Sequence, residues 1–132
     1  MIPKLLIAAV LLAHGAIHAG FVSPRPAPAA GGPPWPFTLD SSWLLGSMGW
    51  DGTAMHWIGV ALTAATIGGF AVAALVALGL LPNALWIGGV TLGAVASIVL
   101  LVLFFHPWLV LGLLIHAAVL WAAWIARWEP SA

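Results

Sequence analysis

Four long apolar runs, almost free of charge, constrain this sequence more than any other feature. Hydrophobic residues make up 64% of the 132 residues, and only 5% are charged. Soluble domains are roughly 25% charged, so this chain has too few polar side chains to cover a water-exposed surface. A helix crosses a bilayer with about 20 apolar residues, and each run reaches that length. The sequence therefore predicts an all-α integral membrane protein.

We expect a single four-span membrane domain, 1–132, with one long loop over residues 23–53. The expected spans cover residues 3–22, 54–80, 83–105 and 107–127. Because proline disfavours helix continuation, Pro82 and Pro107 mark very short turns after the second and third spans. Short turns favour an antiparallel, up-down transmembrane four-helix bundle.

The loop after the first span differs in composition from the rest of the chain. Its first half is rich in proline and glycine, which predicts an extended, polyproline-like segment. Its second half contains Trp43 and Trp50 and predicts a short amphipathic helix in the membrane interface, with Asp40 or Ser41 as its N-cap. Loops of this length are often functional; the alternative is a cover without chemistry.

Few basic residues set the expected orientation. Lys4 and Arg127 flank the two termini, whereas Arg25 lies in the long loop. The positive-inside rule then favours cytoplasmic termini, so we expect a multi-pass protein of the bacterial inner membrane with its long loop outside. A competing interpretation is a signal peptide ending near Ala29, because Lys4 and the apolar residues after it resemble the start of one. Histidines and prolines before that cleavage site do not fit this interpretation.

The composition also excludes several classes of function. A net charge of zero with three basic residues excludes nucleic-acid binding. The absence of cysteine excludes disulfides, thiolate nucleophiles and Cys-ligated zinc. We find no pair of carboxylates for acid–base chemistry and no nucleophile motif, so the sequence predicts no catalytic residue.

Histidines are the main chemical signal in this chain: His14, His18, His56, His106 and His116. Ionisable groups inside a bilayer are costly and usually face the bundle interior. Since His14 and His18 are four residues apart, their rings share one helix face. The helical rise of about 1.5 Å per residue places His116 level with His14, near the membrane midplane.

Two kinds of cofactor fit this pattern. His14, His18, His56 and Asp51 together offer three nitrogens and one oxygen, a set that suits zinc, copper or iron. His116 is the alternative to His56 as the third ligand. Alternatively, His14 and His116, at equal depth on different helices, would be the axial ligands of a b-type haem. Without a cofactor, the histidines would only form hydrogen bonds; a proton relay along them would stop at the midplane.

The third span contains Gly89, Gly93 and Ser97 at four-residue spacing. Small residues let helices approach closely in a bilayer, so this face predicts packing within the bundle or contact with a second copy or a larger membrane complex. The leading functional hypothesis is a binding protein with a histidine site for a transition metal or haem. The alternatives are an accessory subunit whose histidines only form hydrogen bonds and, third, a metal-dependent membrane enzyme.

The segment His14-Gly15-Ala16-Ile17-His18-Ala19-Gly20-Phe21 resembles a motif of small four-span bacterial membrane proteins that lack an assigned function. Their pattern is H-G-x-x-H-x-x-G-F; this chain has one residue, rather than two, between His18 and Gly20. The resemblance extends more faintly to Trp43-Leu44-Leu45-Gly46 and to the glycine-rich second span. It implies a four-span bundle and implies nothing about chemistry.

Overall fold

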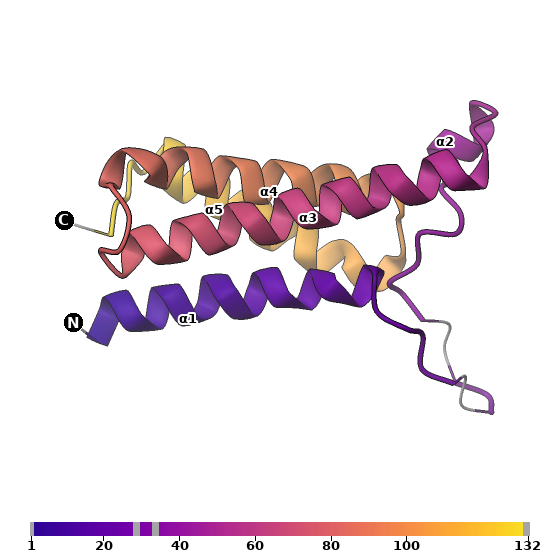
Figure 1. Ribbon diagram of the computed structural model, residues 1–132, viewed down its shortest axis with the longest axis horizontal. Coiled ribbons are helices and arrows are strands. Elements are labelled where there is room, and N and C mark those ends of the chain that lie inside the picture. The colour runs from indigo at the N-terminus through magenta and orange to yellow at the C-terminus, as the bar shows by residue number, and fades with distance from the viewer. Residues whose placement is uncertain (1, 28–29, 33–34, 131–132) are drawn as a thin grey trace.

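The computed structural model describes residues 2–27, 30–32 and 35–130, and within these ranges every regular element is helical (Figure 1). The α-helices are α1 (Ile2–Ile17), α2 (Trp43–Ser47), α3 (Gly52–Ala77), α4 (Trp86–Leu103) and α5 (Val110–Trp124). Short 3₁₀ helices lie beside them: η1 (His18–Phe21), η2 (Asn83–Leu85) and η3 (Pro107–Leu109). The predicted all-α fold class is confirmed.

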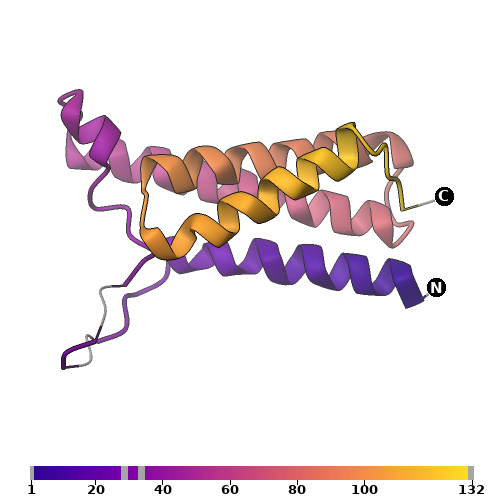
Figure 2. The same ribbon diagram turned by 180° about the vertical axis from the view of Figure 1, so that it is seen from behind.

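Four helical segments are long and apolar enough to cross a membrane: Pro3–Phe21, Gly52–Ala77, Asn83–Leu103 and Pro107–Trp124. They alternate in direction, so both termini lie at one end of the bundle and the long loop lies at the other (Figures 1 and 2). We call these the terminal end and the loop end. The chain is thus a multi-pass membrane protein with the expected up-down order, although α3 begins and ends a few residues earlier than predicted.

The closest contact in the bundle is between α3 and α4, and glycines make it possible. A β-carbon at Gly69 would lie 2.3 Å from the backbone nitrogen of Gly93, and one at Gly89 would lie 3.1 Å from the carbonyl oxygen of Gly69. In a bilayer, such close packing replaces the hydrophobic effect as the force between helices. The predicted small-residue face of the third span therefore packs inside this chain.

Gly89, Gly93 and Ser97 are all buried, so any second copy or larger complex would have to contact another surface. Association with a partner stays a prediction. By contrast, α1 and α5 approach each other much less closely than either approaches its sequence neighbour in the bundle. The gap between α1 and α5 is bridged by histidine side chains, as described below.

The second half of the long loop packs on the loop end. Phe37 contacts Gly20, and Leu39 fills the space above Gly59, where a β-carbon would lie 2.4 Å from the leucine side chain. The ion pair between Arg25 and Asp40 joins the two halves of the loop. The loop is therefore attached to the bundle by apolar contacts and closed on itself by one exposed ion pair.

The predicted interfacial helix exists as α2, but its N-cap was predicted wrongly. Ser42, rather than Asp40 or Ser41, has extended backbone angles and accepts a hydrogen bond from the backbone of Leu45. Its hydroxyl also donates to the carbonyl oxygen of Leu103, over 2.6 Å. This bond to α4 selects Ser42, and Asp40 is already engaged by Arg25.

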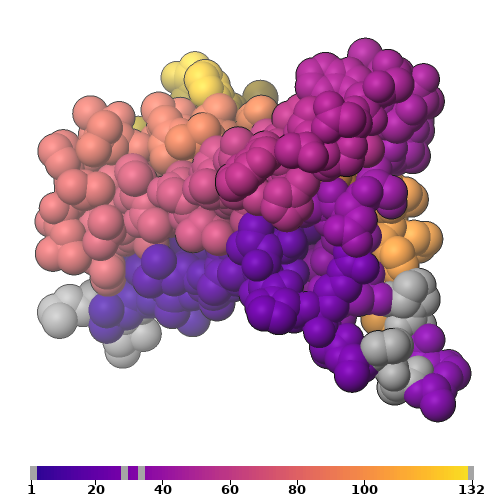
Figure 3. Space-filling model, turned by 45° about the vertical axis from the view of Figure 1, so that its right-hand side comes forward, coloured from indigo at the N-terminus to yellow at the C-terminus, as the bar shows by residue number. Residues whose placement is uncertain are grey.

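In Figure 3, the described residues near Gly31 in the proline-rich half of the loop lie away from the bundle. Its described residues form no helix or strand, as the composition predicts. Residues 28–29, on which the expected signal-peptide cleavage site falls, lie outside the described residues. The loop thus combines a packed half that contains α2 with a half whose described residues form no regular element.

Candidate functional site

Three histidines from two distant parts of the chain meet inside the bundle. His14 lies on α1, His18 in η1 and His116 on α5, and their ring centroids are 4.7 to 5.6 Å apart. His116 is 0% exposed and His18 is 4% exposed, whereas His14 is partly exposed. Phe70 of α3 lies 5.5 Å from the His14 ring and 5.7 Å from the His116 ring. We call His14, His18 and His116 the histidine cluster.

Backbone carbonyls fix the proton positions on two of these rings. Nδ1 of His116 faces the carbonyl oxygen of Gly112, and Nδ1 of His18 lies 3.1 Å from the carbonyl oxygen of His14. Because a carbonyl oxygen only accepts hydrogen bonds, each Nδ1 carries the proton. In the neutral form of both rings, Nε2 then has a free lone pair.

The two Nε2 lone pairs each accept one hydrogen bond. The Ser97 hydroxyl donates to Nε2 of His18 over 2.7 Å, and His14 Nε2–H donates to Nε2 of His116 over 2.9 Å. The Ser97 oxygen also lies 3.5 Å from Nδ1 of His116. The result is a neutral network that ties α1, α4 and α5 together at one depth.

His14 keeps one ring nitrogen out of this network. Its Nε2 is the donor to His116, and none of the described residues forms a hydrogen bond with its Nδ1. The ring is also the most exposed of the three. With an unpaired nitrogen and the most exposed ring, His14 is the most accessible member of the cluster.

Local sequence places the rings in this arrangement. The spacing of four residues puts His18 above the last turn of α1, where carbonyl groups have no helical hydrogen-bond donor. Nδ1–H of His18 donates to one of these groups, the carbonyl oxygen of His14. Gly15 allows α1 to approach α3, since a β-carbon there would lie 3.3 Å from the β-carbon of Phe70. Gly112 similarly faces the side chain of Leu101 on α4. Small residues beside the histidines therefore bring the helices close enough for their rings to bond.

The other predicted ligands lie elsewhere. Asp51 caps α3 by accepting from the backbone nitrogen of Ala54 over 2.9 Å, and His56 is exposed at the loop end. The structure brings His14 and His18 together with His116, but not with His56 or Asp51. Within residues 2–27, 30–32 and 35–130, no three His, Asp or Glu side chains are arranged as a ready-made metal site.

His14 and His116 lie at the same level of the bundle, as predicted, but their Nε2 atoms are hydrogen-bonded directly to each other. Imidazole–metal bonds are about 2 Å long, so two axial ligands of a haem would lie about 4 Å apart on opposite sides of a flat macrocycle. His14 and His116 are 2.9 Å apart between their Nε2 atoms, and Phe70 packs against both rings. A haem would require α1 and α5 to separate.

A pocket of about 150 Å³ lies beneath the long loop, between Arg25, Asp40 and His56. None of the three cluster histidines lines this pocket. The enzyme hypothesis requires a substrate cavity between the histidine cluster and the long loop. This pocket does not reach the cluster, so it does not meet that requirement.

Ser97, Gly112 and Phe70 complete the cluster, and the sequence assigned none of them to it. Ser97 stood out only as a small residue on the third span, although a hydroxyl within an apolar helix is itself a signal for a buried polar partner. Nothing in the sequence marks Phe70 as a neighbour of histidines. Comparisons with protein families, curated proteins and solved structures find no match to this chain.

Proposed function

We propose that this protein binds a transition metal ion within the membrane, between Nε2 of His14 and Nε2 of His116. The observation that carries the proposal is the direct approach of these two nitrogens, 2.9 Å apart, from helices that otherwise make little contact. A metal ion would take the place of the hydrogen bond between them, with the His14 proton moving from Nε2 to Nδ1. Imidazole nitrogen suits zinc, copper and iron alike, so the ligands favour this group of metals without selecting one.

The separation of the two nitrogens is close to what a metal needs. With bonds of about 2.05 Å and tetrahedral angles, two ligand nitrogens lie about 3.3 Å apart. The pair would therefore widen by only about 0.4 Å from its present 2.9 Å. On His116, the bond from Nδ1 to the Gly112 carbonyl already leaves Nε2 free to coordinate. His14 must move its proton from Nε2 to Nδ1, and no described residue forms a hydrogen bond with that Nδ1.

His18 is the candidate for a third ligand. Three imidazoles on one tetrahedral ion have ring centroids about 5 Å apart, and the three cluster rings are 4.7 to 5.6 Å apart. Its Nε2 now accepts from Ser97, so the ring must turn away from that hydroxyl to coordinate. We therefore expect His14 and His116 to be the first two ligands and His18 to be the third.

The test is metal binding by the full chain in detergent micelles, with Co²⁺ followed by visible absorption and Zn²⁺ by calorimetry. We expect about one equivalent bound with little net release of protons, because the three imidazoles are already neutral and His14 only moves its proton from Nε2 to Nδ1. His14→Ala and His116→Ala should each weaken binding at least tenfold. Circular dichroism of each variant shows whether it remains folded.

Two matched controls make the test specific. His56→Ala and His106→Ala remove the same side chain at the loop end, away from the cluster. Both should bind Zn²⁺ like the unaltered protein. Equal loss of binding in these controls, or no loss in folded His14→Ala and His116→Ala, would refute the proposed site.

The second candidate is an accessory subunit whose histidines serve only to join helices. The closed hydrogen-bond network favours it, because five of the six ring nitrogens of the cluster face a partner. A chain that folds normally, binds no Zn²⁺ or Co²⁺ and loses stability on His116→Ala would support this function instead. Under either function, we propose that the termini face the cytoplasm of a bacterial inner membrane, following the positive-inside rule.

A further inference from the structure

A polar pocket lies at the terminal end, far from the histidine cluster. Its volume is about 400 Å³, and it is bounded by the start of α4 and the segment that follows α5. Arg127, Glu129 and Asn83 supply its polar side chains, and Trp86 and Trp124 supply two indoles. The indole of Trp86 donates to the carbonyl oxygen of Trp128 over 3.1 Å, which holds the segment after α5 beside α4.

The two charges in this pocket do not neutralise each other. Among the described residues the only ion pair joins Arg25 and Asp40, so Arg127 and Glu129 lie more than 4 Å apart. The Glu129 carboxylate accepts one long hydrogen bond, 3.4 Å, from Asn83, and the Arg127 guanidinium has no partner in the described chain. The pocket therefore offers one cationic and one anionic group, separated, at the level of the membrane surface.

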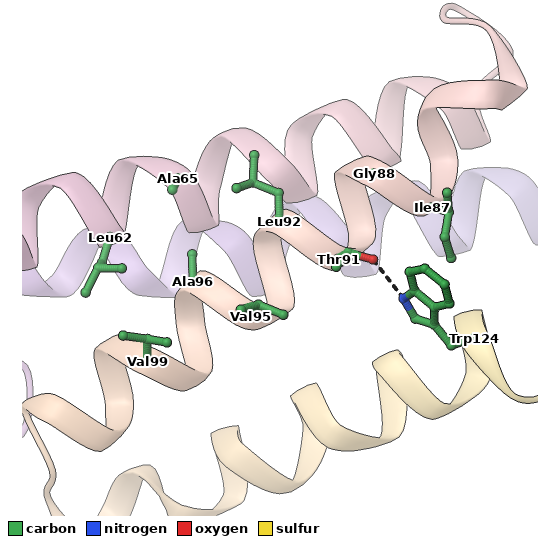
Figure 4. A pocket seen from close by; sticks show the side chains of 10 residues that line it. All are labelled: Leu62, Ala65, Ile87, Gly88, Thr91, Leu92, Val95, Ala96, Val99 and Trp124. Atoms are coloured by element: carbon green, nitrogen blue, oxygen red, sulfur yellow. Dashed lines mark hydrogen bonds between the residues drawn. The ribbon is translucent and has the colours of Figure 1, made fainter.

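An apolar groove continues from this pocket along α4 (Figure 4). Ile87 and Trp124 line both the pocket and the groove, so the two are contiguous. From Gly88 to Val99 the groove runs about 16 Å, which matches the hydrocarbon depth of one leaflet, about 15 Å. Its hydroxyl group, on Thr91, is already paired with the indole of Trp124 over 2.9 Å, so the groove presents a hydrocarbon surface.

We propose that the pocket and the groove together bind one zwitterionic phospholipid of the phosphatidylethanolamine type. The phosphate contacts Arg127, the ammonium group contacts Glu129, and one acyl chain lies along α4. Guanidinium groups are well suited to phosphate oxygens, and an ammonium group gains further from the exposed indole of Trp124, which lines the pocket. This site does not depend on the proposed metal function.

Charge complementarity selects this lipid over the alternatives. An anionic phosphatidylglycerol would satisfy Arg127 but would leave Glu129 facing uncharged hydroxyls. Phosphatidylcholine keeps its positive charge but cannot donate a hydrogen bond to Glu129. We therefore expect affinity to fall in the order ethanolamine, choline, glycerol.

The experiment is native mass spectrometry of the full chain in detergent, titrated with each of the three phospholipids bearing identical acyl chains. We expect phosphatidylethanolamine to bind about tenfold more tightly than phosphatidylglycerol, the difference of about one charge-assisted hydrogen bond. Glu129→Gln should abolish this preference, and Arg127→Gln should weaken binding of all three lipids. Equal affinity of the unaltered chain for the three headgroups would overturn the headgroup assignment.

A glycine pair tests the acyl groove. A β-carbon at Gly88 meets no atom within 4 Å, so Gly88→Leu fills the groove without disturbing the helices. Gly68 on α3 is equally open and does not line the groove, which makes Gly68→Leu the matched control. Gly88→Leu should weaken lipid binding about tenfold, and Gly68→Leu should not. The same effect from both variants, or from neither, would refute the groove.

Discussion

Replacing Gly69 with alanine should be among the most damaging single changes in this protein. The added methyl group would lie 2.3 Å from the backbone nitrogen of Gly93, 2.7 Å from its α-carbon and 2.8 Å from the carbonyl oxygen of Gly89. All three are backbone atoms, so no side chain can rotate away to make room. The two helices must move apart instead.

The cost follows from that movement. Ordinary van der Waals contact begins near 3.4 Å, so α3 and α4 must separate by about 1 Å around Gly69. A gap of about 0.5–1 Å loses a quarter to a half of the dispersion energy of the atoms involved, and overpacking typically costs about 1–3 kcal/mol. Alanine recovers up to about 1 kcal/mol through its higher helix propensity. Because only backbone atoms are in the way, we take the upper end of that overpacking cost, about 3 kcal/mol, and subtracting the alanine gain leaves a net loss of roughly 2–3 kcal/mol in the free energy of unfolding.

The neighbouring glycine provides the control. Gly68 precedes Gly69 on the same helix, and its β-carbon would meet nothing within 4 Å. Gly68→Ala should leave stability unchanged or raise it by up to about 1 kcal/mol. The assay is equilibrium unfolding in mixed micelles of mild detergent and dodecyl sulfate, followed by circular dichroism. Equal stability of Gly69→Ala and Gly68→Ala would show that the α3–α4 contact is not as close as the structure has it.

Further substitutions test the polar contacts. Ser97→Ala removes the donor to His18 and should lower the free energy of unfolding by about 1 kcal/mol; an unchanged value in the same micelle assay would contradict that bond. Thr63→Val should be neutral or stabilising by up to about 1 kcal/mol, because the buried Thr63 hydroxyl has no hydrogen-bond partner in the described chain, and destabilisation would reveal a hidden partner. Arg25→Gln breaks the exposed ion pair with Asp40 and should cost about 0.5 kcal/mol or less, with salt reducing the effect; thermal unfolding at low and high salt measures it.

The fold was largely predictable because it depends on local properties. Hydropathy alone places the four spans, and Pro82 and Pro107 place the turns within a few residues of the observed boundaries. The N-cap of α2 was not predictable in the same way. Ser41 and Ser42 are adjacent and chemically identical, and only the bond from Ser42 to the Leu103 carbonyl selects between them.

The candidate site was predictable in part. The sequence placed His14 and His18 on one helix face and His116 level with His14, and the rings of all three meet in the structure. The assignment of His56 and Asp51 to the same site rested on their position near the outer boundary. The level of a residue along the bundle does not determine the direction in which its side chain points. Neither His56 nor Asp51 lies in the cluster.

The sequence by itself determined that this chain has four helices able to cross a membrane and that His14 and His116 lie at the same level, because apolar length and helical rise are properties of each segment alone. Only the tertiary structure decided which histidines bond to one another, which glycines bring α3 and α4 into contact, and which charges at the terminal end remain apart. These features depend on the rotation and register of one helix against the next. In a bilayer, where hydrophobicity does not distinguish one helix face from another, close packing and hydrogen bonds set that rotation.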